Sequence, residues 1–548
     1  MNAMESAAVV GSMLGIVFAR QQLSNLARFV GGGKATREPE TPHRLECDYL
    51  VVGAGAASLA FVDTLLTELP RAEVILVDRH DAPGGHWNDA YDFVRLHQPS
   101  IVYGLASRKL EGSWLWNFLQ CRAPWQHRAN KSEILAHFTS GVRDWVKSGR
   151  VRYYPRCEYD FSQPEAVHSE GGTLRRFRGC DGSTEYTALV RHKVVNGTVG
   201  EPLIPALCPL PFPVDPWGVE VITPNDLNGL KPLGGGRKRH YVVLGCGKTG
   251  VDTVVYLQRK MRVDPKRDIT LIVPQVPWCY TRDGPRGPHG PMGLWAEVLK
   301  NGGDRDRALR ELGRQGSLTP LFEGTEPTVC RYPVIGKDEL QDVARVGHIV
   351  RRGRIRSVTR SGDQVSLNFR GRGGKVKVKA AADDVCLVNC CAPGPLLKKA
   401  VPPVFDGNII NLSLLFGPPV GFTMTIIGMI EASAQQGLLD ASFCREEIGC
   451  EDPLALFAAY DIMDTSARSM MEVFLNLGLV AAIMRKDPAV TLRWLKRNRL
   501  SMYSIPFVQM NLAEKLHEIS AKRSALGVSR GKARMALALA RKIEGQAF

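Results

Sequence analysis

The feature that most constrains the fold of this chain is an apolar strand that leads into a glycine-rich turn and then into a helix. The strand is Tyr49–Val52, and the turn reads Gly53-Ala-Gly55-Ala-Ala-Ser58. In a turn of this kind the first glycine permits a tight bend, and the second lets backbone amides approach a diphosphate closely. A small third residue, here Ser58, lets the helix pack against the strand. The pattern predicts a βαβ unit that binds a nucleotide at the positive end of its helix.

Two further features lie at the end of the next strand of this unit and just after it. Asp78 ends that strand, where its carboxylate can accept hydrogen bonds from an adenosine ribose. The segment Gly84-Gly85-His86-Trp87 follows, in which the glycines permit close backbone approach and the tryptophan offers a flat surface. A glycine turn beside a core tryptophan explains the same segment, so both interpretations stand.

A second strand, turn and helix of the same kind begins at Arg239. Its turn reads Gly245-Cys-Gly247-Lys248-Thr249-Gly250 and carries all three glycines. The Gly-Lys-Thr ending is similar to a Walker phosphate loop, but Val242 stands where that loop requires glycine. Two such units predict two bound dinucleotides and an α/β fold with two Rossmann-like domains.

The second unit gives a clue to its coenzyme. Its partner strand ends in Val273-Pro274, without the acidic residue that usually accepts a hydrogen bond from the ribose 2′-hydroxyl. This absence favours NADP over NAD. Lys248 and Arg282 are the candidates to contact a 2′-phosphate, although ordinary surface charge explains both residues as well.

Together these motifs resemble those of the flavin-containing (class B) monooxygenases and their relatives. That superfamily has a glycine fingerprint for FAD, a Gly-Gly-x-Trp element, a second glycine motif for NADPH and two small-residue crossing segments; the matching segments here are 53–58, 84–87, 245–250, 196–198 and 389–394. The resemblance implies FAD-binding residues Gly53, Gly55, Ser58, Asp78, Gly85 and Trp87, and NADPH- or NADH-binding residues Gly245, Gly247, Lys248, Thr249, Gly250 and Arg282.

The resemblance also implies a domain order, because the crossing segments let the chain leave and re-enter the first domain. We predict a leader and linker at 1–46, an FAD-binding domain in two parts at 47–238 and 380–438, an NAD(P)-binding domain at 239–379, and a basic helical extension at 439–548.

The activity implied by the resemblance is NAD(P)H-driven oxygenation of a small organic substrate by O2. The family's Phe-x-Gly-x-x-x-His fingerprint is missing, since Pro216–Pro224 contains no histidine. His97 looks aligned with an asparagine that lies near the flavin in the family, and is the candidate catalytic residue; a packed or surface histidine is the alternative. A reductase or dehydrogenase without oxygen insertion, and a non-catalytic dinucleotide-binding protein, remain open as functions.

Cysteine usage argues against two further classes of protein. The chain has 13 cysteines but no Cys-x-x-Cys motif and no zinc-ligand spacing, so we predict neither a dithiol–disulfide reductase nor a metal site. Even the adjacent pair Cys390–Cys391 is best interpreted as buried thiols in a reduced compartment.

Charge and hydropathy leave the location of the protein open. Of the net charge of +16, the last 64 residues contribute 14 Lys and Arg against 4 Asp and Glu, and Arg351–Lys379 is a second basic run. Such runs are typical of solvated faces or of surfaces that attract anionic lipid or acidic partners; we predict no nucleic-acid partner.

Two apolar segments bear on membrane contact. The run Ala7–Ala19 is shorter than the roughly 20 residues of a spanning helix, and it lacks the charged start of a secretory signal. The segment Met470–Met484, with the basic residues after it, suits either a membrane-surface helix or a cap on the FAD domain. We expect a cytoplasmic or organellar protein that has the option of peripheral membrane contact through its basic C-terminal helices.

Overall fold

The computed structural model describes residues 44–119, 126–164, 166–168, 171–200, 202–215, 218–282, 297, 300–301, 304–392, 402–413, 415, 420–438, 488–500, 512–524 and 530–544. Nearly all of the predicted leader and the apolar segment at 470–484 lie outside the described residues. Residues 46–548 form one unit, and the elements below belong to it apart from the first two residues of β1.

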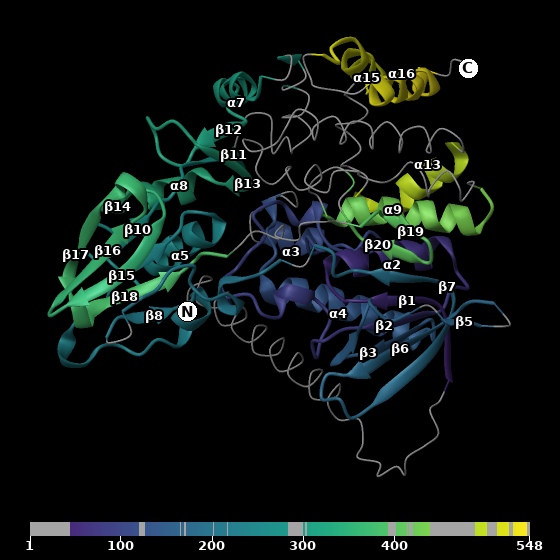
Figure 1. The fold of residues 1–548 in the computed structure, drawn as a ribbon, viewed down its shortest axis with the longest axis horizontal. Coiled ribbons are helices and arrows are strands. Elements are labelled where there is room, and N and C mark those ends of the chain that lie inside the picture. Colours follow the sequence, from purple (N-terminus) through teal and green to yellow (C-terminus); the bar gives the residue numbers. More distant parts are fainter. Residues whose placement is uncertain are drawn as a thin grey trace, which may run out of the picture. The chain divides into compact units, whose positions relative to one another are not determined.

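The first sheet contains three adjacent parallel strands, β1, β2 and β3 (Figure 1). The strand order is β19-β20-β7-β1-β2-β3, and β4, β5 and β6 extend the sheet in antiparallel fashion from β7. Every residue of β2 is buried, as expected for a parallel strand covered on both faces. The strands are β1 (Arg44–Val52), β2 (Val74–Val77), β3 (Val151–Tyr154), β4 (Cys157–Tyr159), β5 (Ala166–Val167), β6 (Thr173–Gly179), β7 (Glu185–Asn196), β19 (Phe405–Asp406) and β20 (Ile409–Asn411).

Three helices pack with this sheet: α2 (Ala56–Glu68), α4 (Lys131–Lys147) and α9 (Val420–Gln435). α2 is apolar nearly all round and packs against α9, where a Cβ on Gly428 would lie 3.1 Å from both the Phe61 carbonyl oxygen and the Thr64 Cβ. Glycine therefore permits this close helix crossing. α4 begins with a capping box between Asn130 and Glu133 and packs against β3.

The second sheet is wholly parallel and has the order β14-β10-β9-β18-β8. Its strands are β8 (Glu220–Ile222), β9 (His240–Leu244), β10 (Ile269–Ile272), β14 (His348–Val350) and β18 (Val385–Asn389), with helices α5 (Lys248–Arg259) and α8 (Lys337–Ala344) nearby. The sheet extends beyond the predicted limits of 239 and 379 on both sides, because β8 and β18 pair within it. The chain returns to the first sheet only at β19 and β20.

Two small sheets accompany the second one. One has the order β12-β11-β13 and the other the order β15-β16-β17; the second of these packs its apolar side chains with those of β9, β10 and β18. The elements are β11 (Pro277–Thr281), β12 (Leu318–Pro320), β13 (Val329–Ile335), β15 (Ile355–Ser361), β16 (Gln364–Phe369), β17 (Lys375–Ala381), and the helices α3 (Trp114–Leu119) and α7 (Arg305–Arg314) elsewhere in the chain.

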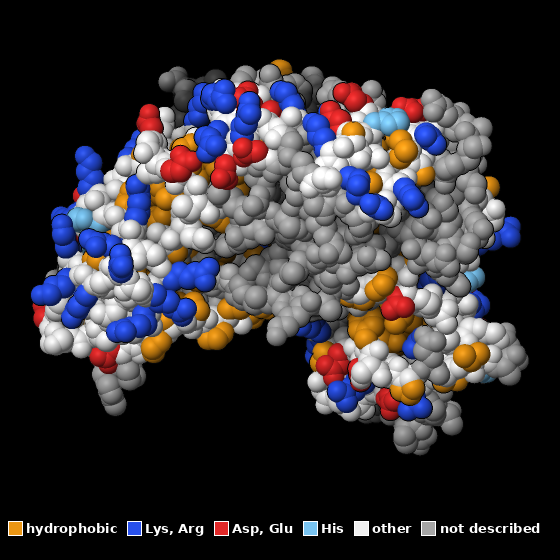
Figure 2. All heavy atoms as spheres, turned by 45° about the horizontal axis from the view of Figure 1, so that its top comes forward, with side chains coloured by type: hydrophobic (Ala, Val, Ile, Leu, Met, Phe, Trp, Pro, Cys, Tyr) orange, Lys and Arg blue, Asp and Glu red, His pale blue; other side chains and the backbone are white. Residues whose placement is uncertain are grey.

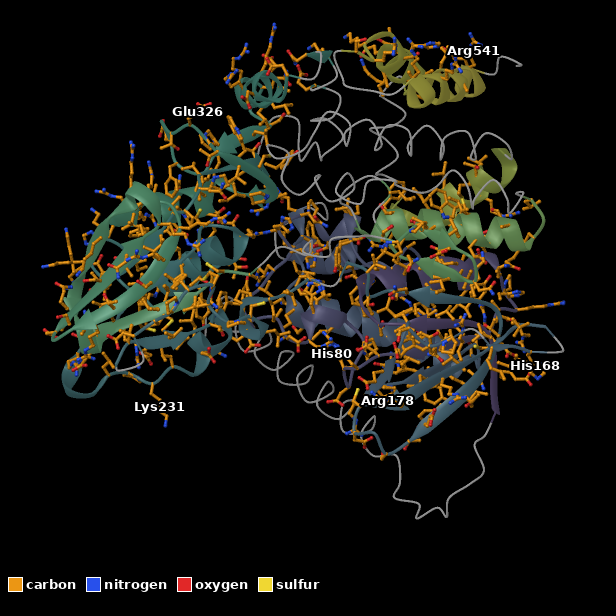
Figure 3. All side chains as sticks on the ribbon, in the orientation of Figure 1. His80, His168, Arg178, Lys231, Glu326 and Arg541 are labelled. Carbon is orange, nitrogen blue, oxygen red and sulfur yellow. The ribbon has the colours of Figure 1, made fainter. Side chains whose placement is uncertain are left out.

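Three helices of the C-terminal region are described: α13 (Pro488–Arg497), α15 (Leu512–Ala521) and α16 (Arg530–Glu544). Trp494 of α13 is 1% exposed, and its ring centroid lies 6.1 Å from that of Phe422 on α9. α13 therefore packs on the first domain. Arg541 of α16 is exposed, as is Lys231 far from it in the sequence (Figure 3). No helix within the described ranges is long and apolar enough to cross a membrane.

Candidate functional site

The first glycine turn folds as the sequence predicts, and the Gly-Gly-His-Trp segment lies on it. Gly53 adopts a φ of 91°, which favours glycine, and its amide donates to the Val77 carbonyl oxygen at 2.7 Å. The Gly84 amide donates to the Ala54 carbonyl oxygen at 2.8 Å. A Cβ on Gly85 would lie 2.9 Å from the Gly55 Cα, so the two backbones meet at a distance that only glycine permits.

Ser58 has a packing role at this turn. Its side chain is fully buried, and its hydroxyl has no hydrogen-bond partner among the residues that the structure describes. A Cβ on Gly197, just after β7, would overlap the Ser58 hydroxyl and lie 2.8 Å from the Val52 carbonyl oxygen. The serine that replaces the usual third glycine is therefore accommodated by a glycine just after the neighbouring strand β7.

The second turn solves the same packing problem the other way round. Here the third position of the turn is Gly250, and a Cβ on it would overlap the Gly245 carbonyl oxygen. The neighbouring segment carries Cys390 where the first unit has Gly197. The two crossing segments are otherwise alike. The Asn196 and Asn389 side-chain oxygens each accept from the amide two residues on, at 3.1 and 3.0 Å. In each unit, the tight turn at this asparagine thus lies beside the helix that follows the glycine turn.

Asp78 lies at the predicted place but already has partners. One carboxylate oxygen accepts from the Ala54 amide, and the other accepts from the His80 amide at 2.7 Å and lies 3.0 Å from the His80 Nδ1. The His80 Nε2 lies 2.8 Å from an Asp89 oxygen. Hydrogen bonding to Asp78 raises the pKa of His80 to about 9. Sequence reasoning missed His80, which is labelled in Figure 3.

Helices α2 and α5 both begin in a way that suits a diphosphate. Each has a glycine N-cap, Gly55 or Gly247, without a side-chain cap and without an acidic residue in the first turn. By contrast, α4 and α7 are capped by Asn130 and Asp304. The first amides of a helix need an acceptor, and the helix dipole favours an anion there. The residues present at both turns therefore fit the diphosphate of a dinucleotide.

Trp87 is buried and does not offer an open face. Its indole Nε1 donates to the Tyr103 hydroxyl at 2.7 Å. Arg499, just beyond α13, in turn binds the backbone around Tyr103. Its guanidinium donates to the carbonyl oxygens of Ile101 at 2.7 Å, of Leu105 at 2.9 Å and of Tyr103. The C-terminal region thus supports the segment that holds Trp87.

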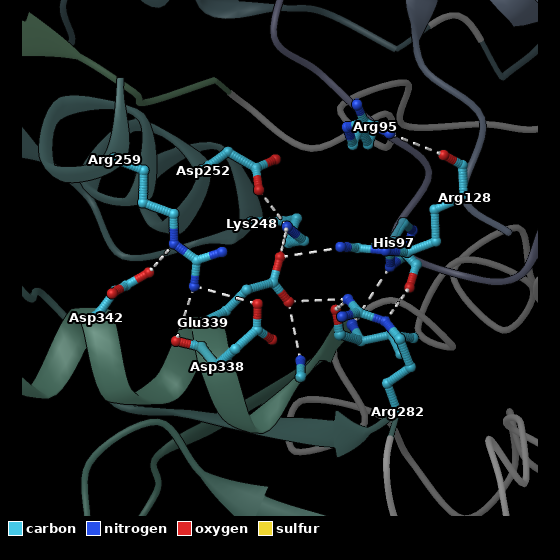
Figure 4. A network of polar contacts seen from close by, with 12 residues as sticks. Arg95, His97, Arg128, Lys248, Asp252, Arg259, Arg282, Asp338, Glu339 and Asp342 are labelled. Atoms are coloured by element: carbon cyan, nitrogen blue, oxygen red, sulfur yellow. Dashed lines mark hydrogen bonds and ion pairs between the residues drawn. The ribbon is translucent and has the colours of Figure 1, made fainter. Parts of the chain in front are cut away.

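Lys248 and Arg282, the two predicted phosphate contacts, meet at one buried carboxylate (Figure 4). Glu339 of α8 is 6% exposed, and its oxygens lie 3.1 Å from Lys248 Nζ and 2.9 Å from Arg282 Nη2. Arg128, from the first domain, lies 3.3 Å away. Lys248 also pairs with Asp252, one turn further along α5. Sequence reasoning missed Glu339, because nothing in its local pattern distinguishes it from a solvated helix residue.

His97 lies beside this ion-pair cluster (Figure 4). The Val334 amide donates to its Nδ1 at 3.3 Å, which leaves the neutral ring with its proton on Nε2. The His97 carbonyl oxygen accepts from Arg282 Nε at 3.3 Å. Burial, with the positive charges of Lys248 and Arg282, lowers the pKa of His97 to about 4. His97 is therefore a neutral hydrogen-bond donor at ordinary pH.

A segment of the first domain also packs directly on α5. Tyr91 donates from its hydroxyl to Asp252 at 2.9 Å, and the Phe93 ring stacks on that of Tyr256 with centroids 3.9 Å apart. The residues from 91 to 97 therefore connect the two units that carry the glycine turns. Most of the predicted site residues gather at the two turns, and the ion-pair cluster around Glu339 lies between the units.

The two glycine turns, each at the end of a parallel strand and before an uncapped helix, define the class. The chain has two Rossmann-like units, each built on a parallel sheet with a glycine turn before a helix. No family model matches the sequence. It is 32% identical over 412 residues to the uncharacterized proteins Rv2000 of Mycobacterium tuberculosis and Mb2023 of Mycobacterium bovis, an overlap that covers 73% of this chain and 70% of theirs. The chain belongs to the family of these mycobacterial proteins.

Solved structures with a similar fold include several monooxygenases. An open structure of cyclohexanone monooxygenase is 15% identical with a TM-score of 0.43, covering 72% of this chain and 88% of that one. Polycyclic ketone monooxygenase from Thermothelomyces thermophila is 12% identical with a TM-score of 0.48, covering 85% and 86%.

Proposed function

We propose that the chain is an FAD-dependent oxidoreductase that takes hydride from NAD(P)H and uses O2 to oxygenate a small organic substrate. The observation that carries the proposal is the pair of uncapped, glycine-started helices, α2 and α5, at the ends of two parallel strands. Two such sites in one chain suit two dinucleotides, and hydride transfer between them is the chemistry that such a pair supports.

The residues divide between the two coenzymes. In this proposal the FAD site is formed by the turn at Gly53, Gly55 and Ser58 with Asp78, Gly85 and Trp87; the NAD(P)H site is formed by Gly245, Gly247, Lys248, Thr249, Gly250 and Arg282. Backbone amides bind the diphosphates, while Ser58, Gly250 and Trp87 act by packing. Bound FAD would supply the capacity to accept hydride and to react with oxygen.

His97 is the residue of this chain that we assign a chemical role. Its Nδ1 is held by the Val334 amide and its pKa is lowered to about 4, so the ring keeps its Nε2 proton. A neutral donor in a fixed orientation can hydrogen-bond an oxygen atom of substrate without giving up its proton. This role requires the neutral ring, because a protonated ring would place a positive charge beside the substrate oxygen.

The test is an absorbance spectrum of the purified protein, followed by anaerobic titration with NADPH and with NADH. We expect a flavin spectrum that bleaches with at least one of the two coenzymes. On admission of oxygen, oxidation of a ketone, amine or sulfide probe in step with coenzyme use supports a monooxygenase.

Three outcomes separate the alternatives. Turnover with quinone or protein acceptors, but no oxygen transfer to any probe, identifies a reductase. A yellow protein that neither coenzyme bleaches identifies a non-catalytic dinucleotide-binding protein. A preparation that is colourless and cannot be reconstituted with FAD contradicts the flavin site itself.

A further inference from the structure

The ion-pair cluster around Glu339 suggests how the proposed coenzyme site is controlled. Four donors converge on this carboxylate: Lys248 at 3.1 Å, Arg282 at 2.9 Å, Arg128 at 3.3 Å and the Gly336 amide at 2.8 Å. Glu339 is 6% exposed, so water cannot replace these donors. A buried carboxylate with several charge-assisted hydrogen bonds is a strong and well-ordered acceptor.

Two of these donors are the cations that would otherwise suit the 2′-phosphate of NADPH. Lys248 is the first residue of α5, within the second glycine turn. The strand β10 leads to Val273 and Pro274, so no carboxylate there repels a phosphate or binds a ribose 2′-hydroxyl. Because Lys248 also pairs with Asp252, its charge is shared between two carboxylates. Among the described residues, three basic side chains and two carboxyl groups therefore contact one another here.

We propose that Glu339 is an internal counterion that limits discrimination between the two coenzymes, because it competes with the 2′-phosphate of NADPH for Lys248 and Arg282. This inference rests on the proposed binding of NAD(P)H at the second turn. A phosphate that approaches these cations must replace contacts already made to Glu339, so it gains less than it would from free cations. NADH has no such group and is unaffected by the competition.

The same helix provides a matched control. Asp342, also on α8, is 3% exposed and lies 2.6 Å from Arg259 Nε and 3.0 Å from Arg345 Nη1. It is thus a buried, paired carboxylate one turn from Glu339 that contacts neither Lys248 nor Arg282 (Figure 4). Neutralising it tests the general effect of removing a buried charge from α8.

The experiment measures equilibrium binding of NADP⁺ and NAD⁺ by calorimetry to the FAD-loaded protein and its Glu339→Gln and Asp342→Asn variants. Glutamine keeps the shape and one acceptor oxygen but not the charge. We expect the ratio of the NAD⁺ to the NADP⁺ dissociation constant to rise about tenfold in Glu339→Gln, the size of one charge-assisted hydrogen bond. In Asp342→Asn the ratio stays within about twofold of the wild-type value.

A double-mutant cycle adds a second readout. Lys248→Met in the wild-type background should weaken NADP⁺ binding only slightly, because Lys248 is already compensated. The same change in the Glu339→Gln background should remove most of the increase in NADP⁺ affinity that Glu339→Gln produces. Should Glu339→Gln fail to fold, Glu339→Asp retains the charge with a shorter reach, and we expect its ratio to rise by a smaller factor.

The outcomes that overturn the inference are distinct from those that overturn the proposed function. Binding of both nucleotides with the same ratio in wild type, Glu339→Gln and Glu339→Asp contradicts the role of Glu339 alone. An equal rise in Asp342→Asn also contradicts it. If neither nucleotide binds the wild-type protein, the proposed coenzyme site is wrong, and the inference is wrong with it.

Discussion

At the scale of single residues, the glycines of the second turn have separable roles. A Cβ on Gly250 would overlap the Gly245 carbonyl oxygen and lie 2.9 Å from its carbonyl carbon, whereas a Cβ on Gly247 would meet nothing within 4 Å. We expect Gly250→Ala to lower the free energy of unfolding by about 2 kcal/mol through overpacking. Gly247→Ala should leave stability unchanged but weaken NAD(P) binding, because its methyl group would stand where the diphosphate approaches. Denaturant unfolding and nucleotide calorimetry distinguish the two, and equal losses of stability would contradict this division.

His97 gives a pH dependence whose sign follows from its surroundings. Its pKa is about 4 in the folded chain against 6.5 ordinarily, so the folded state resists protonation. The stability that this group contributes is fully present above pH 6.5 and is lost as the pH falls towards 4. The full loss is about 3 kcal/mol. Urea unfolding across this range should show that the free energy of unfolding falls more steeply with decreasing pH in wild type than in His97→Asn, which cannot titrate. Equal slopes in the two proteins would mean that folding does not change the pKa of His97.

His80 should behave in the opposite way. Asp78 and Asp89 raise its pKa to about 9. Its contribution is therefore present below the ordinary pKa of 6.5 and is lost as the pH rises towards 9. Taken alone, His80 and His97 together favour the folded state most near neutral pH. Both histidines are visible in the sequence, but their pKa values could not be predicted from it, because the shifts depend on burial and on charged groups that the fold brings close.

At the scale of elements, the glycine turns could be predicted because their determinants are local. The bend at Gly53 and the helix start at Gly55 lie within one short segment, and the strand before them is apolar throughout. Glu339 could not be predicted, since its partners Lys248 and Arg282 are 91 and 57 residues away in the chain. Long-range ion pairs leave no periodic pattern. The membership of β18 in the second sheet was likewise missed, because an apolar strand does not reveal its neighbour.

The segment after α13 makes an element-scale prediction. The Arg499 guanidinium donates to three carbonyl oxygens in the segment from 101 to 105, and that segment holds Trp87 through Tyr103. A lysine in its place keeps the charge but cannot span the three acceptors. We expect Arg499→Lys to lower the free energy of unfolding by about 2 kcal/mol and to reduce retained FAD. Arg497→Lys, at an exposed position two residues earlier, should change neither quantity; comparable effects of both substitutions would show that the guanidinium fork is unimportant.

At the scale of the whole molecule, positive charge is concentrated in two regions. Residues 351–379 contain ten Lys and Arg against one Asp, and the last 64 residues contain 14 Lys and Arg against 4 acidic residues. The combined net charge of these two regions exceeds the net charge of +16 of the whole chain, so the remaining residues together carry a small negative charge. Lys and Arg side chains crowd the surface at the left of Figure 2, where Figure 1 places β15, β16 and β17. The sequence predicted basic runs, and the fold collects one of them on a small sheet.

The strand β17 allows this charge to be tested without disturbing the fold. Lys375, Lys377 and Lys379 alternate with the more buried Val376 and Val378, so all three lysines are exposed. We expect the triple substitution of these lysines by glutamine to lower the salt concentration that elutes the protein from heparin, since fewer counterions are released on binding. The melting temperature should stay the same, because these three side chains are exposed. The matched change of Arg530, Arg534 and Arg541 in α16 to glutamine removes equal charge from the other basic region. We expect the smaller shift from α16, and a larger shift from α16 than from β17 would contradict a leading role of the sheet in binding anions.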